Sequence, residues 1–179
     1  MAMNAAAPVI MTALMDRRAV QRLDDLRQAH FPPERNMLRA HLTMFHHLPG
    51  PQAADLIADV RDAARHEATM TARAKGMMFM GRGSAVRIEC LTLAAFRARL
   101  ADTWHDLLVP QDRQGWRPHV TIQNKVDPKR AKALYADLST GFVPWELKIE
   151  GVSLHWYRGG PWDHMRDVRF SRSSIRPLS

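Results

Sequence analysis

Two tetrapeptides in this chain place a threonine two residues after a histidine: His41–Met44, which reads HLTM, and His119–Ile122, which reads HVTI. The pKa of an imidazole lies near neutrality, so one histidine can accept a proton while a second, protonated one donates a proton. A threonine hydroxyl beside each ring can hydrogen-bond an oxygen on which negative charge develops. The pattern therefore favours acid–base chemistry at an anionic centre, carried by His41, Thr43, His119 and Thr121.

The spacing within each motif is that of a β-strand. Alternate side chains of a strand point to opposite faces, so His41 and Thr43 share one face while the apolar Leu42 and Met44 share the other. The second motif repeats this alternation. Of the nine histidines in the chain, only these two have Ser or Thr two residues later, and the motifs lie about half the chain length apart. Two such strands facing each other would form a site with two histidines and two hydroxyls.

The remaining sequence predicts the elements that hold these strands. The motif strands are expected at residues 39–48 and 118–126. Apolar patterns and turn residues predict further strands at 8–15, 69–80, 84–92, 145–157 and 165–171, and helices at 17–30, 52–68, 93–108 and from 128 to Gly141. Helices and hairpins alternate without regular βαβ units, which indicates an α+β fold with antiparallel sheets. We expect residues 1–179 to form one domain, since that length suffices for one core.

Bulk composition narrows the class of protein. The chain is 46% hydrophobic and 25% charged, as in globular proteins, and its net charge of +8 with a pI near 10.5 favours a polyanionic or phosphorylated partner. Cys90 is the only cysteine, so no disulfide forms within the chain and a cytoplasmic location is expected. As part of an apolar run, Cys90 is predicted to be buried rather than nucleophilic. The apolar run from residue 5 to 15 is too short to span a bilayer, so no membrane partner is expected.

A five-membered cyclic phosphodiester, such as the 2′,3′-cyclic end left by RNA cleavage, matches the chemistry of the two motifs. Opening its ring requires a base that takes a proton from water and an acid that protonates the departing ribose oxygen. Two histidines on opposite sides of the phosphorus can perform both steps. The threonine hydroxyls can bond the non-bridging oxygens. This scheme requires no metal and no other cofactor.

The chain resembles the 2H phosphoesterase superfamily in three features. These are the paired motifs, the proline before the second motif (Arg117-Pro118-His119) and the run Phe31–Asn36 ahead of the first. Within this superfamily, the chain is similar to the bacterial 2′-5′ RNA ligase family, whose members act as RNA 2′,3′-cyclic phosphodiesterases. The resemblance implies a two-lobed fold in which antiparallel sheets form a central cleft, helices pack outside and each lobe contributes one motif. It also implies that His41 donates the proton to the leaving oxygen and that His119 accepts the proton from water.

Substrate-binding residues are expected close to the motifs. Arg117 and Lys125 are the cationic candidates for phosphate contacts. In better-known relatives a basic residue closely follows the second motif, where this chain has Gln123-Asn124-Lys125. Trp116, Trp156 and Trp162 lie in or near predicted loops and are candidates for stacking on a base, while Trp104 and Trp145 are expected in the core.

The other histidines are given structural interpretations. His46 and His47 are read as residues at the end of the first motif strand, because no metal-ligand pattern accompanies them. Simple surface or core positions are predicted for His30, His66, His105, His155 and His164.

Three functions remain open at this point. The first is hydrolysis of a 2′,3′-cyclic phosphate at an RNA end to a 2′-phosphomonoester, with 2′-5′ ligation as a related reaction of the same site. The second is hydrolysis of a small cyclic nucleotide phosphate, such as an ADP-ribose cyclic phosphate. The third is a binding module that holds RNA ends without turnover. A monomer is expected in each case.

Overall fold

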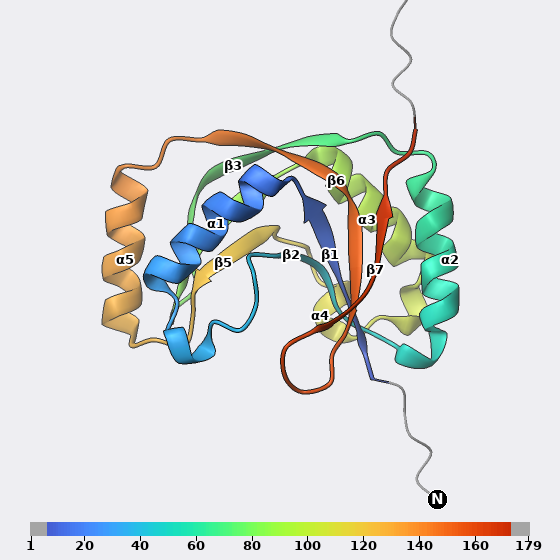
Figure 1. The fold of residues 1–179 in the computed structure, drawn as a ribbon, viewed down its shortest axis with the longest axis horizontal. Coiled ribbons are helices and arrows are strands. Elements are labelled where there is room, and N and C mark those ends of the chain that lie inside the picture. Colours follow the sequence, from blue (N-terminus) through green and yellow to red (C-terminus); the bar gives the residue numbers. More distant parts are fainter. Residues whose placement is uncertain (1–6, 173–179) are drawn as a thin grey trace, which may run out of the picture.

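The computed structural model describes residues 7–172, which form a curved antiparallel sheet with helices around it (Figure 1). The strand order is β2-β1-β6-β3-β4-β5, with β7 paired to β6. The α+β class and the antiparallel pairing predicted from the sequence are thus confirmed. The strands are β1 (Val9–Met15), β2 (Leu42–Leu48), β3 (Met70–Phe79), β4 (Ser84–Glu89), β5 (His119–Gln123), β6 (Trp145–Trp156) and β7 (Asp163–Arg169).

Strand β6 joins the two halves of the sheet. Its first residues pair with β3, from Trp145 to Ile149, and the residues after Ile149 lie between β1 and β7. The two expected sheets are therefore continuous through one long strand. The edge strands β2 and β5 are at opposite ends of the strand order, yet they are in contact because the sheet curves.

Helices lie at both ends of the sheet and across it. Figure 1 shows α5 at one end and α2 at the other. The helix α1 lies against β5 and β6, and α5 packs on β3 and β4. Asp16 caps α1 by accepting a hydrogen bond from the Ala19 amide, and Asp127 caps α5 in the same way through Lys129. The helices are α1 (Arg17–His30), α2 (Ala53–Ala64), α3 (Leu91–Thr103), α4 (Pro110–Arg113) and α5 (Pro128–Thr140).

The core lies between the sheet and the helices α2 and α3. Phe96 and Leu100 of α3 are buried, and so is Trp104 directly after it, which was expected in the core. The indole Nε1 of Trp104 donates to Asp59 of α2 at 2.8 Å, which joins the two helices. Cys90 is buried and its thiol donates to the Thr71 carbonyl at 3.6 Å, in agreement with a structural thiol.

Several boundaries differ from the sequence prediction. The first motif strand begins at Leu42 rather than at residue 39, so His41 immediately precedes β2. The third helix ends at Thr103 rather than at residue 108, and a 3₁₀ turn follows in which Leu107 is 37% exposed. The segment expected as a loop before the second motif contains the short helix α4. In the part of the chain described, no helix is long and apolar enough to cross a bilayer.

Candidate active site

The structure brings both motifs into one pocket. Thr43 of β2 and His41, which directly precedes β2, line this pocket. His119 and Thr121 of β5 line it as well. The pocket has a volume of about 450 Å³ and lies where the two edge strands meet. Four side chains separated by about half the chain thus share one cavity, as the motif analysis predicts.

Both histidine rings are oriented by the same backbone contact. The His41 Nδ1 lies 2.8 Å from the Arg39 carbonyl oxygen, and the His119 Nδ1 lies 2.7 Å from the Arg117 carbonyl oxygen. A carbonyl oxygen only accepts, so Nδ1–H is the donor in each pair. In a neutral ring Nε2 is then the unprotonated nitrogen, and it is the one available to a bound group.

Burial keeps both rings uncharged in the free protein at neutral pH. The pKa of His41 falls from 6.5 to about 4, mainly because burial disfavours the imidazolium. The Arg39 carbonyl opposes this shift, whereas the charges of Arg27, His155 and His119 add to it. Burial also lowers the pKa of His119; the Arg117 carbonyl opposes this shift, and the charges of His46 and Arg117 reinforce it. An anionic ligand would shift both values upward.

Two buried arginines hold the edge strands in place. Arg27 of α1 donates to the Thr121 carbonyl at 2.8 Å and to the side chain of Asn36, within the Phe31–Asn36 run. Arg97 of α3 donates to the Met44 carbonyl at 2.7 Å. Edge strands leave backbone carbonyls without sheet partners, and these guanidinium groups supply donors to them. The arginines thereby fix the backbone of both motifs.

The two candidate phosphate-binding residues are placed differently. Arg117 lines the pocket, next to His119 in space as well as in sequence. Lys125 is not among the lining residues; it lies in the exposed turn after β5, in the left-handed region with φ of 58°. Gln123 is buried at 2% exposure and also stays outside the pocket. Of the two predicted phosphate-binding residues, the structure thus places Arg117 in the pocket lining and Lys125 outside it.

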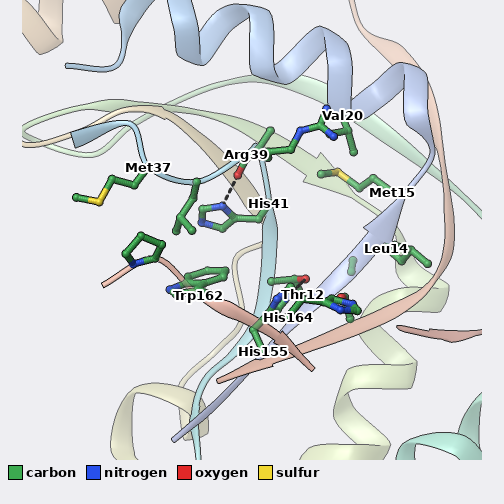
Figure 2. A pocket seen from close by; sticks show the side chains of 15 residues that line it. Thr12, Leu14, Met15, Val20, Met37, Arg39, His41, His155, Trp162 and His164 are labelled. Atoms are coloured by element: carbon green, nitrogen blue, oxygen red, sulfur yellow. Dashed lines mark hydrogen bonds between the residues drawn. The ribbon is translucent and has the colours of Figure 1, made fainter. Parts of the chain in front are cut away.

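Trp162 lies at the boundary between this pocket and a second one. Its ring centroid is 4.6 Å from that of His41, and it lines both cavities. Figure 2 shows the second pocket, of about 430 Å³, with Trp162 beside His41 and with His155 and His164 nearby. Sequence reasoning gave these last two histidines no role near the motifs. The sequence did not indicate them, because β6 and β7 are far from His41 along the chain and come close to it only when the chain is folded.

His46 and Asp112 are further pocket residues that the sequence did not reveal. Both line the first pocket, and the His46 Nδ1 lies 3.0 Å from the Asp112 carboxylate. Trp116, considered for base stacking, also lines this pocket, where its Nε1 donates to the Thr43 carbonyl at 3.0 Å. Trp104 is buried, as expected, while Trp145 is only partly buried, with Arg22 stacked on its ring.

No group of three histidine, cysteine, aspartate or glutamate side chains that could hold a metal ion exists within residues 7–172. The polar groups that line the first pocket are instead suited to hydrogen-bonding and protonating an anionic group.

Known proteins share this architecture. The structure of TT0787 from Thermus thermophilus matches 93% of this chain and all of its own, with a TM-score of 0.69 and 16% sequence identity. Structures of E. coli LigT complexed with 3′-AMP and with NADP⁺ match 93% of this chain and 99% of theirs, with TM-scores of 0.59 and 0.58 and 15% identity. At these identities the likeness concerns the fold. Among curated protein sequences, none matches this chain.

The sequence itself carries the family assignment. The family described as the 2′-5′ RNA ligase superfamily matches residues 15–161, a span that includes both motifs and the strands between them. Membership supports a phosphoesterase- or ligase-type activity. With its two histidine motifs in one pocket and its match over most of the sequence, the chain belongs to the 2′-5′ RNA ligase superfamily.

Proposed function

We propose that this protein hydrolyses the 2′,3′-cyclic phosphate at an RNA end to a 2′-phosphomonoester, without a metal ion. The observation that carries the proposal is the matched pair of histidines: each has Nδ1 bonded to the carbonyl two residues earlier, and both line one pocket with a threonine. Superfamily membership supports a phosphoester substrate. The complex of the structurally similar LigT with 3′-AMP supports a nucleotide substrate.

The reaction assigns one step to each ring. His119 Nε2 accepts a proton from water as the water oxygen forms a bond to phosphorus. The bond between phosphorus and O3′ breaks, and protonated His41 Nε2 donates its proton to O3′. The products are a 3′-hydroxyl and a 2′-phosphate. Thr43 and Thr121 bind the non-bridging oxygens, on which negative charge increases in the transition state.

The low pKa of His41 is compatible with its role as the acid. In the free protein the ring is neutral, but a cyclic phosphate bound beside it brings a negative charge that favours the imidazolium. Substrate binding and protonation of the acid are thus coupled. If the 5′-hydroxyl of a second RNA replaces water, the same proton transfers yield a 2′-5′ linkage.

Turnover of a short RNA with a 2′,3′-cyclic phosphate, in excess EDTA, tests the proposal. Wild type should release a 2′-phosphate, and His41→Ala and His119→Ala should each lose roughly two or more orders of magnitude in kcat/KM. No turnover of this RNA by wild type refutes the RNA assignment. Turnover of only a small cyclic nucleotide phosphate then favours that substrate, and binding of RNA ends without turnover favours a binding module.

A sulfur atom in place of O3′ tests the assignment of the acid. A thiolate leaves without a proton, so the substrate with sulfur at this position should restore most of the activity of His41→Ala and little of that of His119→Ala. The opposite pattern would exchange the two roles.

A further inference from the structure

A bulge in β2 turns His46 toward the pocket. Strict alternation from Thr43 would place residue 46 on the same face as Leu42 and Met44, in the core. The pairing with β1 is irregular, however, since Thr43 faces Thr12 while Phe45 already faces Met11, so Met44 is an extra residue. A bulge of this kind changes which side chains point to a given face, and such bulges are common beside active sites. As a result, His46 lines the pocket that holds Thr43.

A buried carboxylate holds the His46 ring in this orientation. Asp112, 1% exposed, accepts the His46 Nδ1–H at 3.0 Å as well as the backbone N–H groups of His46 and His47. These hydrogen bonds lower the pKa of Asp112 although burial opposes the shift, so the carboxylate is ionised. With Nδ1 occupied, Nε2 is the ring nitrogen of His46 that remains for a ligand.

Other charged groups around His46 make this end of the pocket electropositive. Arg97 of α3 lies next to Asp112, and Arg117 lines the same pocket from the segment before β5. The charges of His46 and Arg117 both lower the pKa of His119, so both groups lie near that ring. His41 lines the pocket as well, and Asp112 is the only carboxylate among the described lining residues.

We propose that His46 is a third histidine that binds substrate: together with Arg117 it binds a second phosphate, one nucleotide away from the phosphorus held between His41 and His119. This inference rests on the proposed function for the identity of the substrate and extends it. It makes an RNA end, with its internal phosphates, a better ligand than a single nucleotide with one phosphate.

Binding of two nucleotides tests this proposal without turnover. Adenosine 3′-monophosphate carries one phosphate, and adenosine 3′,5′-bisphosphate carries a second at the position of the next RNA phosphate. Calorimetry should show that wild type binds the bisphosphate roughly 10–100-fold more tightly, as a charge-assisted hydrogen bond allows. His46→Phe should abolish this preference and leave the affinity for the monophosphate unchanged. His47→Phe is the matched control, since His47 is the exposed neighbour outside the pocket lining, and it should keep the preference.

Three results would overturn the role of His46: no preference in wild type, a preference that survives in His46→Phe, or equal loss of both ligands in that variant. If His46→Phe does not fold, His46→Gln replaces it, because an amide can still donate to Asp112 but carries no charge. These outcomes are independent of catalysis. Failure of the proposed function would instead appear as absence of cyclic phosphate turnover with the binding preference intact.

Discussion

His41 is predicted to stay uncharged in the free protein well below neutral pH. Burial lowers its pKa from 6.5 to about 4, and the nearby charges of Arg27, His155 and His119 act in the same direction. With a pKa of 4, about one molecule in a thousand carries a protonated His41 at pH 7. Because so small a fraction of His41 is protonated, the bound substrate must stabilise its imidazolium form if His41 is to act as the general acid.

An NMR titration of the histidine ring protons measures this shift directly. The His41 resonance, assigned by its loss in His41→Gln, should remain at its neutral position from pH 8 to about 5 and move only below that. Adding 3′-AMP, whose phosphate would lie beside the ring, should raise the apparent pKa by about 1–3 units. A pKa of 6.5 or higher in the free protein would refute the argument from burial, and a pKa unaffected by the nucleotide would refute the coupling of binding to protonation.

Three further predictions concern the scaffold. First, the pKa values of His41, His119 and His155 are all lower in the folded protein, so the unfolded chain binds more protons below pH 6.5. Urea denaturation should therefore show that the free energy of unfolding falls as the pH is lowered from 6.5 to 4, and that it falls less steeply in His41→Gln. A free energy of unfolding that does not change over this pH range would contradict the shifts. Arg27→Met should lower the free energy of unfolding by about 2–3 kcal/mol, because the buried guanidinium bonds the Thr121 carbonyl and Asn36; a loss below about 0.5 kcal/mol would show that these bonds contribute little. Trp104→Ala should cost about 3–5 kcal/mol in the same assay, since its ring is 2% exposed between α2 and α3, and full stability would argue against that packing.

The elements were predictable where local signals are strong. The α1 helix follows the aspartate cap Asp16 and ends at His30, before Phe31 and two prolines, and these limits match the predicted helix at 17–30. The strands of the two motifs were predictable because alternation of polar and apolar side chains is a local property, although His41 itself lies just before β2. Their convergence into one pocket was implied by the family resemblance and is observed in the fold.

The parts that were missed depend on long-range geometry. The position of His46 in the pocket was not predicted, because a bulge reverses the alternation of side chains after Thr43. This bulge depends on the irregular pairing with β1, which the sequence of β2 alone does not indicate. Asp112 lies in a four-residue helix within a polar segment, and its partner is 66 positions away in the sequence. Lys125 shows that closeness to a motif in the sequence need not bring a side chain into the pocket lining. The turn after β5 carries it outside the pocket.

The central claim is that His41 and His119 act together on one phosphorus. The most direct test compares kcat/KM for wild type, His41→Ala, His119→Ala and the double variant on a short RNA with a 2′,3′-cyclic phosphate, in excess EDTA. Each single variant should lose roughly 100-fold or more, and the double variant should be about as slow as the slower single one, because residues that act as a unit are not additive. The claim would be contradicted if wild type were inert until a divalent metal was added, or if either single variant kept activity within about threefold of wild type.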